Sequence, residues 1–414
     1  MKYIGFGLQQ ENTVQFANQI LSGYGTTIFT VMSALAQEHG AVNLGQGFPD
    51  WEGPEEVRRI AAEGLMNGYN QYPPMAGIPE LRRAVAAHDR RFYGMDVDPM
   101  REVIITSGAT EALAAALLGL LNPGDEVVLI EPLYDSYLPI VQLAGAVPRL
   151  VRVEPPLWDL PRAALAAAFG PKTRMLVMNS PMNPTGKVFS DDDLAFIADL
   201  VKAHDAIAVC DEVHEHLVFD GRRHTPLMTL PGMRERTVRI GSAGKTFSLT
   251  GWKVGYLVAD APIAAALGRA HQFLTFTTPP NLQQAVAHGL SMDRSYFDDL
   301  AAGLAAKRDL LSDGLRRVGF DVLKADGTYF IGADIRPLVG EMDDAEFSRR
   351  LTIEAGVTCL PFSAFYQAGD IRNFVRFCFC KRESVLEEAV GRLERFFAAG
   401  GFTRADVQTA AVGA

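Results

Sequence analysis

The sequence contains few of the features that mark secreted, membrane-spanning or metal-binding proteins. Only four of the 414 residues are cysteines, and no two of them stand in C-x-x-C spacing. Each lies in an apolar run, which is typical of a buried, reduced thiol in a cytoplasmic protein. No apolar run reaches the ~18 residues of a membrane span, and the first residues lack the basic and apolar segments of a secretion signal. We therefore expect a cytoplasmic protein without membrane or metal sites.

An excess of positive charge is also absent. The chain has 39 Lys and Arg against 49 Asp and Glu, which gives a formal net charge of −10. An acidic balance of this size argues against a nucleic-acid-binding surface. Hydrophobic residues make up 48% of the chain, enough for a large core in about two or three domains. The composition favours a globular protein that acts on small molecules.

Apolar strands alternate with helices through the middle of the chain. Continuous Val, Ile and Leu runs of this kind predict a mostly parallel sheet that is covered on both faces. Strands are expected at 102–106, 126–131, 146–153, 173–180, 206–212, 237–242 and 255–260, and helices at 79–93, 111–121 and 190–204.

The two ends of the chain follow a different pattern. Helices are expected at 27–39, 54–67, 294–318, 343–355 and 383–398, with short strands among the last three. This mixture indicates an α+β unit. We expect an N-terminal arm and part of a small domain at 1–53, a large domain at 54–300, a C-terminal small domain at 301–400 and a tail at 401–414. Residues 1–22 are polar and read as an arm or a poorly ordered extension.

The segment SAGKTFSLTGWKVG carries the strongest chemical signal. Lys245 lies in a loop of small residues after an apolar strand, and Lys253 follows eight residues later. A lysine with so little bulk around it suits a Schiff base to an aldehyde cofactor that carries a phosphate. The segment also resembles a nucleotide-binding P-loop. That motif needs a glycine where Arg239 stands, so the loop is too short to surround a triphosphate.

Three further segments place polar groups after predicted strands. SGAT at 107–110 opens a helix whose backbone amides can approach an anion. The prolines of NSPMNPTG hold Asn183 in a rigid turn, where its amide can bond a phenolate oxygen. Asp211 closes a buried strand, and a carboxylate there needs a cation such as a protonated pyridine nitrogen. The carboxyl ends of strands are where open α/β sheets bind ligands.

Two other side chains leave alternatives open. Tyr134 follows the strand 126–131, so its ring could lie against a heteroaromatic cofactor or simply pack in a loop. Arg376 alternates with apolar neighbours in NFVRFCF, which indicates an inward guanidinium that needs a carboxylate. That carboxylate belongs either to a substrate or to a salt bridge within the protein.

In this order and spacing, the motifs resemble the fold-type I, pyridoxal-phosphate-dependent class I/II aminotransferases. The resemblance covers about residues 25–398. Within the family, the chain is most similar to the kynurenine, glutamine and methionine aminotransferases. The resemblance implies a large, doubly covered, mostly parallel sheet domain and a smaller α+β domain made from both chain ends. It also implies a homodimer with shared active sites.

The resemblance assigns roles by matching position. Lys245 would bind pyridoxal 5′-phosphate (PLP) and move a proton, Asp211 would pair with the pyridinium nitrogen, and Asn183 would bond O3′. The remaining cofactor contacts would come from Tyr134 on the ring, from Ala109, Thr110, Ser242 and Lys253 on the phosphate, and from Tyr72 on the phosphate of the partner subunit. Arg376 would clamp the substrate α-carboxylate, helped by Asn183 and the backbone of Gly47.

One residue departs from the family pattern. The family usually has a tyrosine three residues after the aspartate, and this chain has His214 there. Histidine can still donate a hydrogen bond to O3′, but it also titrates near neutral pH. A histidine at this position resembles the related cystathionine β-lyases. A PLP-dependent C–S β-lyase therefore stays open as an alternative activity.

Substrate choice is indicated by a missing cation. Where aspartate aminotransferases place an arginine from the partner subunit, this chain has Phe273. An apolar side-chain pocket is expected from Phe29, Phe273, Phe276 and Tyr329, although each could be plain core. The expected amino donors are Met, Phe, Tyr, Leu, Gln and kynurenine. A non-catalytic effector-binding domain, as in regulators that fuse this fold to a DNA-binding helix-turn-helix, is a remote alternative. Only about 25 residues precede the fold, which is too few for such a DNA-binding domain.

Overall fold

A seven-stranded sheet forms the centre of the larger part of the molecule. The computed structural model describes residues 17–402. From one edge to the other, the strands are β2 (Val103–Thr106), β8 (Gly255–Ala259), β7 (Thr237–Ser242), β6 (Ile207–Asp211), β5 (Thr173–Asn179), β3 (Glu126–Glu131) and β4 (Val147–Arg152). Only β8 runs antiparallel to its neighbours. The carboxyl ends of the other six strands therefore meet at one edge.

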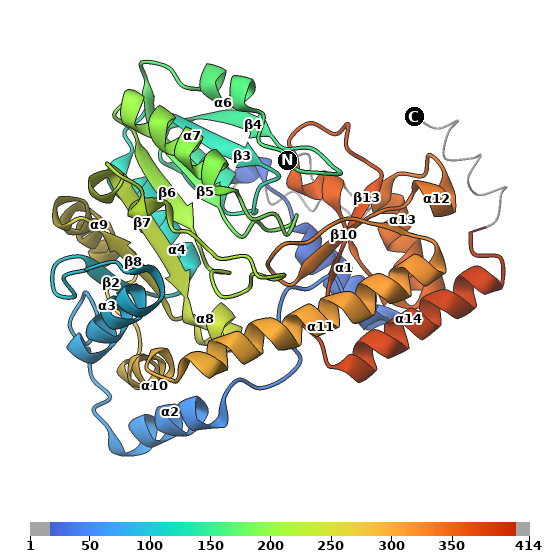
Figure 1. Ribbon diagram of the computed structural model, residues 1–414, viewed down its shortest axis with the longest axis horizontal. Helices are drawn as coiled ribbons and strands as arrows, with labels where there is room; N and C mark the ends of the chain where they lie inside the picture. The colour runs from blue at the N-terminus through green and yellow to red at the C-terminus, as the bar shows by residue number, and fades with distance from the viewer. Residues whose placement is uncertain (1–16, 403–414) are drawn as a thin grey trace.

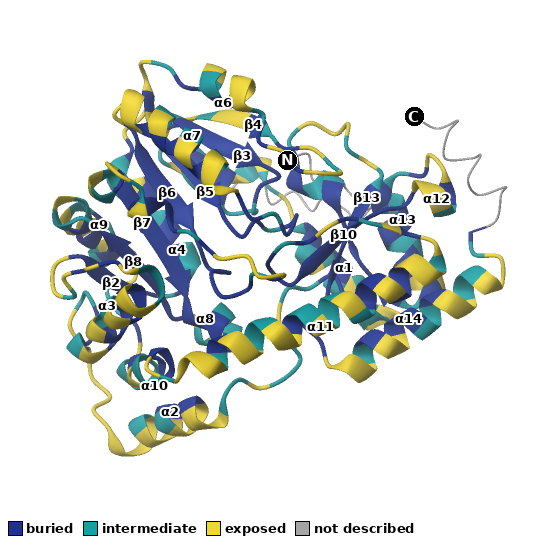
Figure 2. Ribbon diagram, in the orientation of Figure 1, coloured by how far each residue is buried: buried dark blue, intermediate teal, exposed yellow. Residues whose placement is uncertain are grey.

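Successive residues of the central strands pack on opposite faces, and both faces are buried, which is why these strands are mostly apolar. Leu176 and Met178 of β5 lie in the core under α7 (Asp191–Ala203). Met175 and Val177 lie in the core under α4 (Ala109–Leu120) on the other face. Figure 2 shows the sheet buried between helices whose outer faces are exposed. The predicted doubly covered, mostly parallel sheet is confirmed.

The remaining helices of this part surround the sheet (Figure 1). They are α2 (Glu55–Asn67), α3 (Pro79–Tyr93), α5 (Tyr137–Leu143), α6 (Arg162–Ala168), the single turn α8 (Ala243–Thr246), α9 (Ala261–Leu274) and α10 (Pro280–Leu290). The helix α7 begins with a capping box, in which the Ser190 side chain accepts from the Asp193 amide and the Asp193 side chain accepts from the Ser190 amide. The sequence analysis did not predict α5, α6, α9 or α10.

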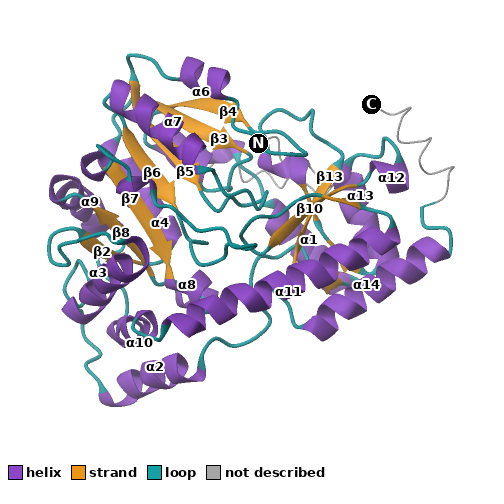
Figure 3. Ribbon diagram, viewed as in Figure 1, coloured by secondary structure: helices purple, strands orange, loops and turns teal. Residues whose placement is uncertain are grey.

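A smaller unit is built from segments near both ends of the chain. Its antiparallel sheet has the order β12 (Leu360–Pro361), β13 (Phe374–Cys378), β10 (Phe330–Asp334) and β9 (Asp321–Val322). A separate parallel pair joins β1 (Val42–Asn43) to β11 (Val357–Thr358). The helices are α1 (Ile28–Glu38), α12 (Arg336–Val339), α13 (Asp344–Arg350), which continues into a π-helical turn, and α14 (Glu383–Ala398). Figure 3 shows this mixture of helices and short strands beside the large sheet.

The long helix α11 (Arg294–Val318) runs from beside α10 to the smaller unit (Figure 1). The domain boundaries expected after residues 53, 300 and 400 stay predictions, and the second of them falls inside this helix. Most of the expected tail at 401–414 and most of the expected arm at 1–22 lie outside the described residues. Between residues 17 and 402, none of the helices has the length and apolar character needed to cross a membrane. All four cysteines are buried and free.

Candidate active site

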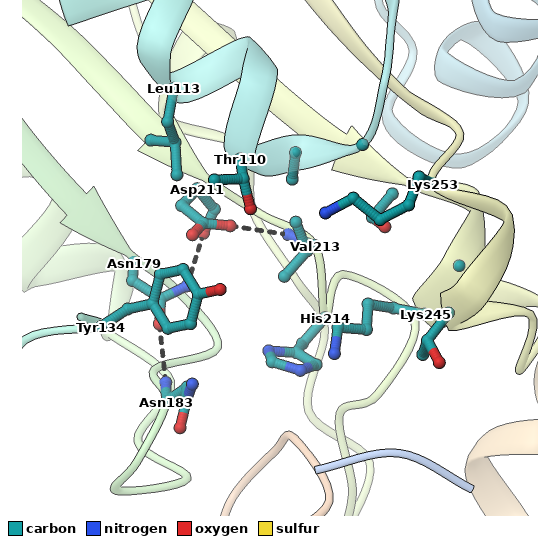
Figure 4. A pocket seen from close by; sticks show the side chains of 15 residues that line it. Thr110, Leu113, Tyr134, Asn179, Asn183, Asp211, Val213, His214, Lys245 and Lys253 are labelled. Atoms are coloured by element: carbon teal, nitrogen blue, oxygen red, sulfur yellow. Dashed lines mark hydrogen bonds between the residues drawn. The ribbon is translucent and has the colours of Figure 1, made fainter. Parts of the chain in front are cut away.

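A cavity of about 220 Å³ opens at the carboxyl edge of the large sheet. The turn from β2 to α4 contributes Gly108, Ala109 and Thr110. The ends of β5, β6 and β7 contribute Asn179, Asn183, Asp211, His214, Ser242 and Lys245, and Tyr134 and Lys253 complete the polar lining. Figure 4 shows the side chains that line this cavity. The cavity thus brings together residues that are spread over about 145 positions of the sequence.

One wall of the cavity is suited to a phosphate. Gly108 has a φ of 81° and directly precedes the first turn of α4, where no side chain caps the backbone amides. Gly255 lies so close that a Cβ there would meet the Gly108 carbonyl carbon at 2.6 Å. A Cβ on Gly108 would in turn lie 3.3 Å from Lys253 Nζ. Free helix amides beside a lysine ammonium form an anion site, and this arrangement fits the phosphate of PLP.

Asp211 lies at the floor of the cavity. It accepts a hydrogen bond of 2.5 Å at Oδ2 from the Tyr137 hydroxyl, and one of 3.4 Å at Oδ1 from the Val213 amide. Burial raises the pKa of Asp211, while the bond from Tyr137 opposes that rise. No cation is paired with this carboxylate among residues 17–402. A protonated pyridine nitrogen would supply the missing positive charge.

Two residues of this floor were missed by the sequence analysis. Tyr137 lies three residues after Tyr134, in the same EPLYDSY segment. Asn179 donates to the Asp211 carbonyl over 2.8 Å and accepts from the Asn183 amide over 2.6 Å. It therefore fixes the loop that carries Asn183. Asn179 stood inside the NSPMNPTG segment and Tyr137 near Tyr134, but nothing in the sequence showed which atoms they face.

Arg376 is a buried cation without a carboxylate. Its Nη1 donates to Asn183 Oδ1 and its Nη2 to the Gly45 carbonyl, each over 2.7 Å, and its side chain is 0% exposed. The Nε atom has no partner, and the guanidinium lies 3.8 Å from the centre of the Phe330 ring. Burial lowers the pKa of Arg376 to about 10, so it stays charged near neutral pH. No salt bridge within residues 17–402 uses this charge, which leaves it for a ligand carboxylate.

The amine of Lys245 points into the cavity (Figure 4). Nζ contacts the Tyr329 hydroxyl at 2.5 Å and the Gly47 carbonyl at 3.4 Å. Burial lowers the pKa of Lys245, which makes the neutral, nucleophilic amine more available than in an exposed lysine. A carbonyl bound in the cavity would therefore meet an activated amine.

His214 lies beside Lys245 with both ring nitrogens buried, and within the described chain it lies near the Pro181 carbonyl, with which it makes no well-aligned hydrogen bond. Its ring packs edge-on against Tyr329, with 5.1 Å between the ring centres. Burial lowers the pKa of His214 well below its usual range, and the nearby Lys245 acts in the same direction. A neutral imidazole has one nitrogen that donates and one that accepts. An unsatisfied buried donor of this kind fits a cofactor oxygen such as O3′.

The expected side-chain pocket is not assembled at this cavity. Tyr72 and Phe273 are 79% and 88% exposed, and Tyr72 packs edge-on against Phe276. Phe29 lies 5.4 Å from the Arg376 guanidinium and borders a second cavity of about 700 Å³. Tyr329 is buried, and its hydroxyl faces Lys245 and Gly47. Of the four residues expected to form the pocket, Phe29 contacts Arg376 and Tyr329 contacts Lys245 within one chain.

Comparisons with known proteins agree with this geometry. The sequence model of the class I and II aminotransferase family matches residues 39–393. A probable N-succinyldiaminopimelate aminotransferase of Mycobacterium tuberculosis is 47% identical, over 90% of this chain and 96% of its own. Methionine aminotransferase of Escherichia coli is 40% identical over the same shares. The solved M. tuberculosis structure superposes with a TM-score of 0.89, covering 92% of this chain and 99% of the other.

Proposed function

Because this chain belongs to the class I and II aminotransferases, which use PLP, we propose the class of amino acid on which it acts. The donor is an L-amino acid with an aromatic, sulfur-containing or other uncharged side chain. Its amino group passes to a 2-oxo acid in a ping-pong cycle. Arg376 carries this proposal, because it is the buried cation near the cavity that has no carboxylate within the described chain.

The residues of the cavity fit PLP. Asp211 would face the pyridine nitrogen, Asn183 and His214 would bond O3′, and Tyr134 would lie against the ring. Ser242, Lys253 and the amides of Ala109 and Thr110 would hold the phosphate. When bound, PLP supplies an electron sink that stabilises negative charge on the substrate Cα. Lys245 then has two tasks for which its lowered pKa suits it: attack on a carbonyl and transfer of the α-proton.

Arg376 orients the substrate. A bidentate guanidinium–carboxylate pair fixes both the position and the plane of the α-carboxylate. Arg376 donates to Asn183 and Gly45 through its two Nη atoms, and its Nε has no partner. A substrate carboxylate would therefore form a new hydrogen bond with Nε in addition to any that it replaces. Once the α-carboxylate is fixed, the α-proton can be presented to Lys245.

The charges near Arg376 favour an uncharged side chain. The second cavity is bordered by Phe29, and its charged lining residues among 17–402 are Asp135, Asp343 and Arg372. Arg372 lies 3.8 Å from Asp343, so its charge is shared within the chain. A negative excess repels an additional carboxylate and tolerates an amide, thioether or aromatic amine. This supports Met, Phe, Tyr, Leu, Gln and kynurenine over Asp and over an N-succinylated diaminopimelate.

A substrate panel tests this proposal. We expect kcat/KM for L-methionine, L-phenylalanine, L-glutamine and L-kynurenine to exceed that for L-aspartate by at least ~30-fold, because one unpaired carboxylate costs about 2 kcal/mol or more. N-succinyl-L,L-2,6-diaminopimelate enters the same panel, because its distal end carries two more carboxylates. A higher kcat/KM for that compound or for aspartate would overturn the proposed donor class.

His214 supports a second candidate activity, a C–S β-lyase. Its neutral ring lies beside Lys245 and Tyr329, at the position where a tyrosine is usual in the family. An imidazole at this place can accept or deliver a proton, which elimination of a thiol requires. Steady release of pyruvate and ammonia from cystathionine, without an added 2-oxo acid, would identify this activity. Its absence would leave transamination alone.

We also propose a cytoplasmic homodimer in which Tyr72 serves the phosphate of the partner subunit. The exposed Tyr72 ring and the half-buried Phe276 ring, 5.4 Å apart, support a contact surface there. Mixing two inactive variants, Tyr72→Ala and Lys245→Ala, tests the arrangement. If Tyr72 acts across the interface, a mixed dimer has one intact site and regains activity. If Tyr72 acts within its own chain, both sites stay defective and no activity returns.

A further inference from the structure

Tyr329 makes a closer contact with Lys245 than any residue predicted for the cofactor. Its hydroxyl lies 2.5 Å from Lys245 Nζ and donates to the Gly47 carbonyl over 2.7 Å. We propose that Tyr329 is a positioning residue that holds the Lys245 amine against the Gly45–Gly47 segment, next to Arg376. The proposal rests on the proposed function, because it assigns to Tyr329 the orientation of the group that carries the α-proton.

Tyr329 itself is held rigidly. It is 2% exposed, and its ring packs against Phe330 and His214 with centre distances of 4.7 and 5.1 Å. Its carbonyl accepts from the Phe379 amide over 2.9 Å. A side chain with so few alternative rotamers can fix the position of a flexible lysine.

The residue before Tyr329 adopts a strained backbone conformation. Thr328 is β-branched but has a φ of 67°, in the left-handed region. Its amide donates to the Leu217 carbonyl over 2.8 Å, and the Gly327 amide donates to the Gly186 carbonyl over 2.8 Å. These bonds join the smaller unit to loops that follow β5 and β6. Strain maintained by several long-range contacts is a common feature of functional sites, and here it directs Tyr329 at Lys245.

Gly47 connects Lys245 to the substrate-binding arginine. A Cβ on Gly47 would meet Phe330 Cζ at 2.6 Å, so glycine lets this backbone lie directly against the Phe330 ring, next to Tyr329. The same segment accepts from Arg376 at the Gly45 carbonyl. A substrate held by Arg376 would therefore lie beside the amine that Tyr329 and Gly47 restrain.

The direction of the hydrogen bonds favours a charged lysine. The Tyr329 proton is given to Gly47, so the lone pairs of the hydroxyl oxygen face Lys245 and accept from its ammonium. The other titratable and charged groups that face this pair are Asp211, His214, Arg376, Cys378, Cys380 and Tyr134. Tyr329→Phe leaves all of them in place and removes the hydroxyl that accepts from Lys245 and donates to the Gly47 carbonyl. Lys245 should then lose its proton at lower pH.

The test compares Tyr329→Phe with Tyr366→Phe. Tyr366 is an equally buried tyrosine whose hydroxyl donates to the Val153 carbonyl over 2.7 Å, away from Lys245. In the protein freed of PLP, competitive acetylation followed by mass spectrometry of the Lys245 peptide gives the titration midpoint of that lysine. We expect Tyr329→Phe to lower the midpoint by about 1 pH unit and Tyr366→Phe to leave it unchanged.

With PLP restored, we expect Tyr329→Phe to lower kcat for methionine about 10-fold while KM changes less than about 3-fold. Thermal unfolding of both variants shows that each is folded. A Lys245 midpoint that is the same in the wild type and Tyr329→Phe would overturn the inference. A shifted midpoint in a protein that transaminates no amino acid would instead remove the proposed function and leave the positioning contact standing.

Discussion

Two buried arginines on neighbouring parts of this fold are used in opposite ways. Arg239 and Arg376 are both 0% exposed. Arg239 binds Glu212 through Nε at 2.7 Å, Asp89 through Nη1 at 2.8 Å, and also Glu215. Within residues 17–402, Arg376 hydrogen-bonds only to an amide oxygen and a backbone carbonyl. A charge that is neutralised inside the chain serves the fold, whereas one that is left without a counter-charge is available to a ligand.

The same division runs through the turn that follows β6. Asp211 and His214 line the cofactor cavity. Glu212 and Glu215 turn the other way to Arg239, and His216 bonds His88 over 2.8 Å. The two sides of one turn thus differ in how their polar groups are satisfied. The side whose charges are not paired within the described chain identifies the place where cofactor and substrate complete the structure.

Removing Arg376 should give the largest effect on activity. For Arg376→Gln we expect kcat/KM for methionine to fall about 1,000-fold, because truncating one member of a buried charge pair costs about 4 kcal/mol. Stability should stay the same or rise, because an unpaired buried charge is gone. The matched substrate is 3-(methylthio)propylamine, which is methionine without its carboxylate. Its kcat/KM should change little in Arg376→Gln. Equal losses for the two amines would show that Arg376 does not bind the carboxylate.

Removing Arg239 should act on stability instead. Arg239→Met leaves three buried carboxylates without their cation, so we expect the free energy of unfolding to fall by about 3–5 kcal/mol. Arg317→Met is the control. It removes an exposed ion pair with Glu394 and should cost less than about 1 kcal/mol. Urea unfolding of both variants measures the difference. An Arg239→Met protein as stable as the control would show that Arg239 does not stabilise the fold and would contradict the proposed difference between the two arginines.

The smallest expected effect is a pH dependence from His216. Burial lowers the pKa of His216 to about 3, against the opposing charge of Glu215. In the unfolded chain His216 binds a proton near pH 6.5, whereas in the folded chain it stays neutral down to about pH 3. The folded state therefore keeps its full stability above pH 6.5 and loses stability relative to the unfolded state as pH falls toward 3. Between pH 7 and pH 5, the wild type should lose about 2 kcal/mol more than His216→Gln. Parallel stability curves for the two proteins would contradict this.

Much of the fold follows from local sequence. The strands β3, β5, β6 and β7 are rich in Val, Ile, Leu and Met, and they were predicted to within about two residues. The helices α9 and α10 were missed because they begin directly after a strand end and a proline pair, without a polar capping residue that bonds the first turn. Pattern reasoning depends on such boundary signals, and tertiary packing can replace them.

The candidate site divides in the same way. Lys245, Asp211 and Asn183 stand at strand ends in recognisable motifs, so their meeting was predictable from a parallel sheet. Which side chains would form hydrogen bonds or ion pairs with them could not be predicted. Tyr137 lies 74 residues from Asp211, and Asp89 lies 150 residues from Arg239. The sequence analysis used Arg239 only to exclude a P-loop, although this residue is the centre of the buried ion network.

The most direct test of the central claim is the absorbance spectrum of the PLP-loaded protein during one half-reaction. L-methionine is added without a 2-oxo acid, and the Lys245→Ala variant serves as control. The account predicts that the band of lysine-bound PLP is replaced by that of pyridoxamine phosphate, that a 2-oxo acid restores it, and that the variant does neither. A lysine-bound band that persists with methionine, while cystathionine yields pyruvate and ammonia, would contradict it.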